Sequence, residues 1–113
     1  MLKYLFNIDL KELSLELGNI HTLTLNNLQY IKKLPVELGN IYTLNLLNLL
    51  CVQELPSELG NVHILDISNL PNIKKLPLEL GNVHMLTLSI LPYFKELPLE
   101  LCKVHTLNYY LQN

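Results

Sequence analysis

Four histidines stand at equivalent points of a repeating sequence, and they are the first candidates for metal or proton chemistry. His21, His63, His84 and His105 are separated by multiples of 21 residues, and Tyr42 takes the one remaining place. Imidazoles bind Zn²⁺, but a zinc site needs ligands that converge tetrahedrally on one point. Equivalent positions in stacked repeats hold their side chains parallel, about 5 Å apart. We therefore expect a stack of rings and no metal site.

Glutamates with the same spacing are the second candidates: Glu16, Glu37, Glu58, Glu79 and Glu100. Paired carboxylates do acid–base work only where a cleft gives them different environments. From the second member onward, each glutamate follows a proline by two residues, and a carboxylate there faces the positive end of a helical turn. The nucleophile and acid candidates are all members of such columns, so we predict no catalytic residue, no cofactor and no enzymatic activity.

The elements that position these columns come from one period. Gly18, Gly39, Gly60 and Gly81 are each followed by asparagine, 21 residues apart. Fixed self-similarity at this length is typical of a solenoid, in which each repeat buries its apolar face against its neighbours. We predict a single domain over residues 1–113, with about five 21-residue repeats, a degenerate first repeat and a truncated last one.

One repeat, residues 62–82, indicates the local structure. Leu65 and Ile67 have the period of two of a strand with one buried face. The phrase that closes the repeat predicts a short 3₁₀ or α turn, with Pro77 in its first position and Gly81 ending it in the left-handed conformation. Stacked repeats would then align their strands in a parallel sheet, about 4.8 Å apart.

This pattern resembles the leucine-rich repeat proteins over about residues 2–111, in the spacing Val62-x-x-Leu65-x-Ile67-x-x-Leu70-x-x-Ile73 and in the ending Leu-Pro-x-Glu-Leu-Gly-Asn. The resemblance implies an α/β solenoid: a right-handed coil with a parallel concave sheet and short 3₁₀ or α turns on the convex side. It also implies a scaffold that binds another protein through the concave sheet. The chain has leucine at 28, 49, 70 and 91, where the family has Asn or Cys, so no ladder of amides is expected at that column. The string Leu-Gly-Asn-Val-His also resembles repeats encoded by large DNA viruses of amoebae.

The candidate partner-binding residues are those that alternate with the buried strand positions. Short hydroxyl and amide side chains dominate, and Asp66 is the only charge among them. Threonine also favours strands in general, so a merely solvated sheet surface is the competing interpretation. We expect Leu47, Ile64 and Met85 to run obliquely across adjacent strands as an apolar anchor. The full set is Thr22, Thr24, Asn26, Thr43, Asn45, Leu47, Ile64, Asp66, Ser68, Met85, Thr87, Ser89, Thr106, Asn108 and Tyr110.

Composition limits the partners. The net charge is −2, which argues against nucleic acid, since that needs clustered Lys and Arg. No stretch approaches eighteen uninterrupted apolar residues, so no membrane span is expected. Cys51 and Cys102 lie in different repeats, beyond the ~7 Å Cα separation of a disulfide. We therefore predict free thiols in a reducing cytoplasm, the host's if the protein is viral.

The ends leave two alternatives open beside an adaptor. Solenoids need capping units, and none is recognisable here, so apolar layers and strand edges at the two ends invite self-association. The chain could thus be a structural segment that assembles end to end, or an uncapped remnant of a longer array without a role of its own.

Overall fold

The computed structural model describes residues 2–6, 20–92, 94 and 97–110, and among them it shows an open coil of strands and 3₁₀ turns. The strands are β1 (Leu2–Phe6), β2 (Thr22–Asn26), β3 (Thr43–Leu47), β4 (Ile64–Ser68), β5 (Met85–Ser89) and β6 (Thr106–Tyr110). The 3₁₀ turns are η3 (Val36–Asn40), η4 (Ser57–Asn61), η5 (Leu78–Asn82) and η6 (Leu99–Lys103). The predicted strands and 3₁₀ turns are confirmed.

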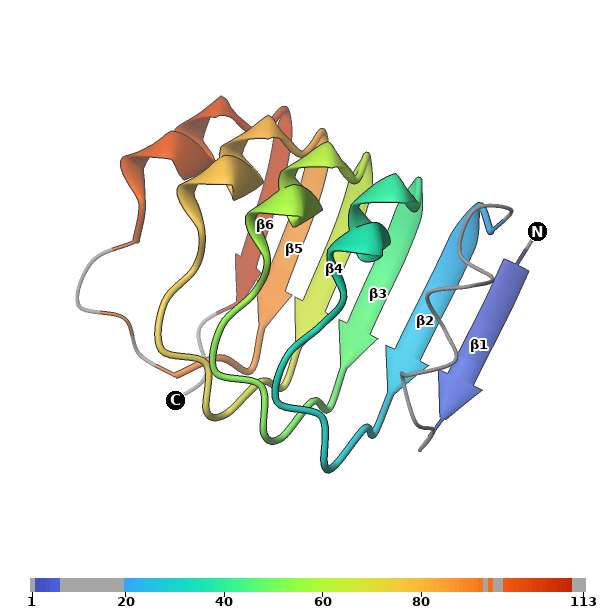
Figure 1. Ribbon diagram of the computed structural model, residues 1–113. Helices are drawn as coiled ribbons and strands as arrows, with labels where there is room; N and C mark the ends of the chain where they lie inside the picture. Colours follow the sequence, from blue (N-terminus) through green and yellow to red (C-terminus); the bar gives the residue numbers. More distant parts are fainter. Residues whose placement is uncertain (1, 7–19, 93, 95–96, 111–113) are drawn as a thin grey trace.

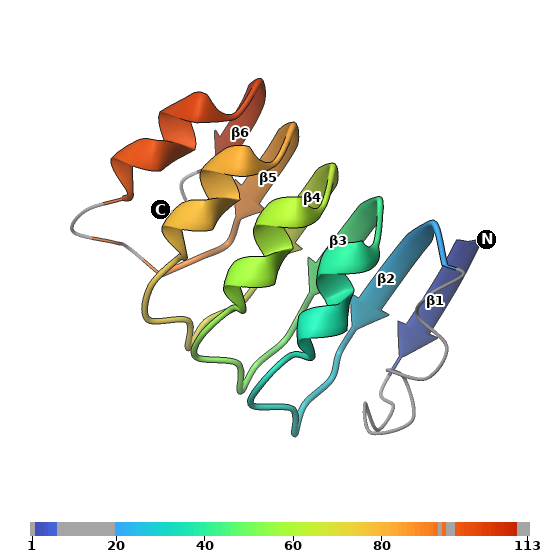
Figure 2. The ribbon, with the colours of Figure 1, turned by 45° about the horizontal axis from the view of Figure 1, so that its top comes forward.

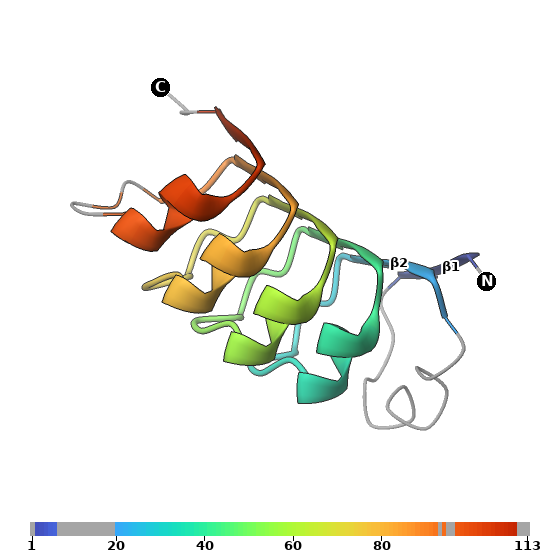
Figure 3. The same cartoon turned by 90° about the horizontal axis from the view of Figure 1, so that it is seen from above.

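The six strands form one parallel sheet in chain order, β1 to β6. From β2 onward each residue pairs with the residue 21 positions later, for example Thr43 with Ile64. Between β2 and β6, the chain leaves one strand, crosses to the other face of the sheet, passes through a 3₁₀ turn and returns as the neighbouring strand, which makes the coil right-handed (Figure 1). This is the hand that parallel crossovers favour. All four 3₁₀ turns lie on one side of the sheet (Figure 2), and the sheet bends with its free face concave (Figure 3).

The core lies between the sheet and the turns and is made of aligned aliphatic columns. Residues two and four of each strand from β2 to β5 point inward and are at most 1% exposed. Those eight residues are Leu23, Leu25, Leu44, Leu46, Leu65, Ile67, Leu86 and Leu88. Burying such a side chain contributes about 1.5–3 kcal/mol, so the columns supply much of the stability of the coil.

The 3₁₀ turns correct two details of the prediction. Pro56 stands one place before η4 rather than in its first position, and its carbonyl accepts the N–H of Leu59 at 3.1 Å. None of the three described glycines, Gly39, Gly60 and Gly81, has a positive φ, so the predicted left-handed ending is wrong. Glycine is required there because neighbouring repeats come close: a Cβ on Gly60 would lie 2.5 Å from the carbonyl oxygen of Glu79. The predicted turn with Glu16 and Gly18 lies outside the described residues.

The left-handed conformation occurs instead just after β2, β3, β4 and β5. Asn27, Asn48 and Asn69 have φ of 59°, 58° and 60°, which asparagine tolerates better than other residues with a Cβ. Their side chains also connect the repeats, because Asn48 Nδ2 donates to Asn26 Oδ1 and Asn69 Nδ2 donates to Asn48 Oδ1, both at 2.7 Å. The coil therefore contains an amide ladder, one position before the column where the leucine-rich repeat pattern has its asparagine.

Ile90 takes the fourth place of this asparagine column, with φ of 53° although it is β-branched. Its side chain is 43% exposed, so replacing it loses little buried apolar surface. We expect Ile90→Asn to stabilise the protein by about 1–2 kcal/mol, the cost of the left-handed conformation, measured by urea unfolding. Ile90→Gly should recover most of this gain through the backbone alone, and an Asn variant less stable than the parent would contradict the assignment of strain.

Candidate partner-binding face

The free face of the sheet carries all fifteen predicted binding residues. They occupy the first, third and fifth positions of β2 to β6, and in β2 to β5 these positions are half-buried while the second and fourth are buried. In β6 the alternation weakens, since Leu107 and Tyr110 are both exposed. The sequence thus placed the whole candidate set on one face, which lies opposite the 3₁₀ turns (Figure 3).

The predicted apolar anchor does not form. Ile64 and Met85 are direct partners in the register of β4 and β5. Leu47, however, pairs with Ser68 at the far end of the neighbouring strands. Four residues of strand separate Leu47 from the level of Ile64, or roughly 13 Å. The face therefore has one apolar pair, Ile64 and Met85, and an isolated leucine.

Side-chain hydrogen bonds tie the polar residues of this face together across the strands. Asn45 Nδ2 donates to Thr24 Oγ1 at 3.0 Å, and Asn108 Nδ2 donates to Thr87 Oγ1 at 3.4 Å. In the next column the Ser89 hydroxyl donates to Ser68 Oγ at 3.1 Å. These bonds restrict the rotamers of the six side chains that they join.

Asp66 is the exception at the centre of the face. It lies between Asn45 and Thr87 in the register, and no side chain among the described residues donates a hydrogen bond to its carboxylate. Partial burial raises the pKa of Asp66 above its ordinary value, because desolvation disfavours the charged form. A half-buried carboxylate without a hydrogen-bonding side chain is a ready acceptor for an external donor or cation.

One outward residue was missed by the sequence analysis. Tyr4 of β1 pairs with Thr24, so it lies in the same column as Asp66, and its side chain is 57% exposed. Asn26 donates a hydrogen bond to its hydroxyl. Paired residues of β1 and β2 are 20 positions apart rather than 21. A strict 21-residue period therefore does not place Tyr4 in this column. Tyrosine is enriched among the residues that dominate binding energies.

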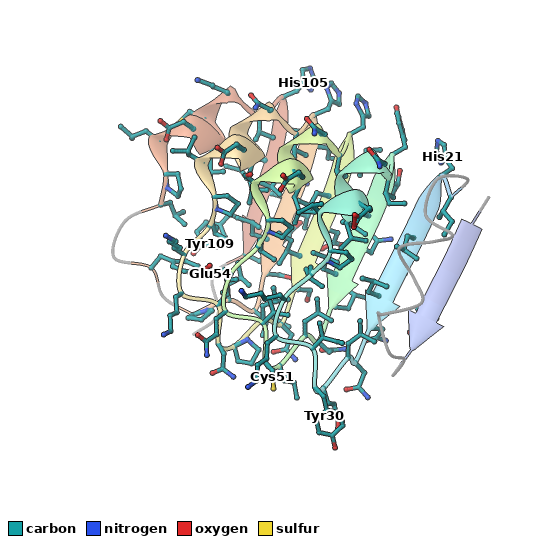
Figure 4. All side chains as sticks on the ribbon, in the orientation of Figure 1. His21, Tyr30, Cys51, Glu54, His105 and Tyr109 are labelled. Atoms are coloured by element: carbon teal, nitrogen blue, oxygen red, sulfur yellow. The ribbon has the colours of Figure 1, made fainter. Side chains whose placement is uncertain are left out.

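The histidine column forms the predicted stack along one edge of the sheet. The rings follow the order His21, Tyr42, His63, His84 and His105, with centroids 4.4–4.7 Å apart. Its two ends, His21 and His105, lie along the same upper edge (Figure 4). The two terminal histidines also contact threonine hydroxyls, at 3.0 Å for His21 and Thr22 and at 3.1 Å for His105 and Thr106.

This stack should make stability depend on pH. Desolvation, followed by repulsion from His105 and His63, lowers the pKa of His84 below its ordinary value of 6.5. In this range the unfolded chain binds more protons than the folded one. The contribution of His84 to the free energy of unfolding is therefore fully present above pH 6.5, and it is lost as the pH falls through the folded-state pKa. NMR titration should find that His84 titrates below its ordinary value of 6.5.

The control for the pH dependence of stability is His84→Tyr. This variant keeps an aromatic ring in the column, as Tyr42 does in its own repeat. Urea unfolding at pH 7.5 and pH 5.5 should show a smaller loss of stability for His84→Tyr than for the parent. A His84 that titrates at or above the ordinary value would refute the predicted coupling.

The other candidates of the sequence occupy ordinary structural positions. Glu37, Glu58, Glu79 and Glu100 lie in the first turns of η3 to η6, on the convex side. Cys51 and Cys102 are unpaired, as predicted. Within the described ranges, no group of three or more His, Cys, Asp or Glu side chains could hold a metal ion.

No protein-family model, no curated protein and no solved structure matches this chain. In the part of the chain that the structure describes, no helix is long and apolar enough to span a membrane.

Proposed function

We propose that this protein is a non-catalytic interaction module of the leucine-rich repeat type that binds a partner protein through its concave face. The observation that carries the proposal is Asp66, a half-buried carboxylate at the centre of a face whose neighbouring side chains hydrogen-bond to one another. Partial burial disfavours the charged form of this carboxylate, and a cationic group of a partner would offset that cost.

The same carboxylate defines the partner. A lysine or arginine presented by the partner would pair with Asp66, and exclusion of water by the interface would strengthen that pair. The apolar residues Ile64 and Met85 lie beside Asp66 and offer contact for the stem of such a side chain. Tyr4 and Tyr110, at opposite ends of the sheet, supply exposed rings for the rim.

The two thiols support a proposal about the cellular setting. Both cysteines are unpaired, and free thiols persist in a reducing compartment. We accordingly place the protein in the cytoplasm, and in that of the host if it is viral, as the resemblance of its repeats to those of large DNA viruses implies.

Affinity capture from cell lysate, with Ile64→Lys/Met85→Lys beside the parent, tests the proposal. The matched control is Leu78→Lys/Leu99→Lys, which makes the same change at two exposed positions of the convex turns. We expect a protein that the parent and the convex variant retain and the concave variant loses. Asp66→Asn should lose it too while remaining as stable as the parent, because the amide removes a desolvated charge. Equal capture by all four proteins would refute the proposal.

End-to-end association is a second candidate, and Leu107 favours it. Its equivalents on the inner face, such as Leu86, are fully buried, whereas Leu107 on β6 is 41% exposed. A second copy laid against β6 would cover it and continue the parallel sheet. This alternative predicts a molar mass that rises with concentration in light scattering, and a constant monomer mass after Leu107→Glu.

A further inference from the structure

A hollow of about 550 Å³ opens on the convex side, remote from the concave face and the histidine stack. It is lined by two segments of consecutive repeats, residues 32–34 and 53–56. These segments climb from the lower loops toward η3 and η4, and Glu54 lies in front of the sheet there (Figure 4). Its volume falls within the range of small-molecule pockets, about 300–1,000 Å³.

One main-chain hydrogen bond differs between this pair of repeats and the next pair. Between the repeats of residues 41–61 and 62–82, the N–H of Lys74 donates to the carbonyl of Gln53 at 2.9 Å and ties the two segments together. In the described residues no corresponding backbone bond joins the N–H of Gln53 to the carbonyl of Lys32. The N–H of Gln53 and the carbonyl of Lys32 are therefore not bonded to each other, and a molecule in the hollow could bond to either group.

The lining combines positive charge with an apolar floor. Lys32 and Lys33 are exposed and contribute two ammonium groups, against one carboxylate from Glu54. Leu34 and Leu55 are buried, so they form the floor, and Pro56 adds an apolar wall. Such a lining suits a molecule with one negative charge and an apolar body, because the ammonium groups attract the charge while the floor accepts the hydrocarbon.

We propose that this hollow is a binding site for a small organic anion with an apolar body, of the monocarboxylate class. The single carboxylate would meet Lys32, Lys33 and the Gln53 N–H. Glu54 would disfavour ligands with several negative charges, by repulsion. The site is independent of the proposed partner-binding face, so either could exist without the other.

Two probes test this site on the full chain: 8-anilinonaphthalene-1-sulfonate, an apolar anion that fluoresces when shielded from water, and octanoate as its competitor. The test variant is Lys32→Gln/Lys33→Gln. Lys74→Gln/Lys75→Gln is the matched control, since it removes the equivalent pair of the repeat of residues 62–82, outside the hollow. Amide chemical shifts in NMR locate the bound octanoate.

We expect saturable binding that octanoate displaces, with the largest shifts at residues 32–34 and 53–56. The test variant should bind about tenfold more weakly, as for the loss of two exposed ion pairs, and the control within about twofold of the parent. Equal weakening of both variants would show attraction to surface charge alone and overturn the proposal. Shifts confined to the concave strands would also overturn it, as would displacement by an acidic peptide but not by octanoate.

Discussion

Gly60→Ala should destabilise the protein by about 1–3 kcal/mol or more, the range for forcing extra volume into a packed site. The added Cβ would lie 2.5 Å from the carbonyl oxygen and 3.0 Å from the Cβ of Glu79, so the backbones of η4 and η5 would have to separate. The carbonyl is main chain and cannot rotate away as a side chain could. Urea unfolding followed by circular dichroism measures the change.

The sign of this effect separates two explanations of the repeated glycine. Gly60 has no positive φ, so if only backbone flexibility mattered, alanine would stabilise the protein by about 0.4–1 kcal/mol. Ser57→Ala in the same turn is exposed and should change stability by less than about 0.5 kcal/mol. A Gly60→Ala protein as stable as the parent would show that the close approach of the repeats is not limiting.

Leu65→Ala should cost about 2–5 kcal/mol, through lost burial and the cavity left behind. Leu65 is 1% exposed and lies in the central inward column of the sheet, with Leu44 and Leu86 as register partners. Repeats on both sides hold the column in place, so collapse around the cavity is restricted. Thermal and urea unfolding both give this loss.

Ile64→Ala is the matched control, because Ile64 precedes Leu65 in the same strand but points to the free face and is half-buried. It should cost clearly less than Leu65→Ala. Similar losses for the two variants would contradict the assignment of inward and outward faces, and with it the identity of the candidate binding surface.

Much of the fold could be predicted from the sequence because one period governs it. The 21-residue spacing fixes the register, as in Thr43 with Ile64, and the alternation of Leu65 and Ile67 fixes which face is buried. The role of Gly60 could not be predicted, because glycine serves both left-handed turns and close backbone approach, and only the position of the next repeat decides between them.

One feature that was not predicted and one wrong prediction, in contrast, could have been derived from the period itself. Asn27, Asn48 and Asn69 form a column with 21-residue spacing, and the tolerance of asparagine for the left-handed conformation could have placed the amide ladder there. Counting by 21 from Leu47 gives Ser68 as its partner. The distance between Leu47 and Ile64 was therefore also predictable. The environment of Asp66 was not, since it depends on which neighbours hydrogen-bond to one another.

Site-specific photo-crosslinking shows whether the concave face meets a partner protein. A benzophenone amino acid would replace Thr87, beside Asp66 on the free face, or Asn82, exposed on the convex turn η5. After irradiation in cell lysate, the account predicts a defined adduct with another protein from position 87 and none from position 82. Adducts from position 82 alone, or equally from both, would contradict it.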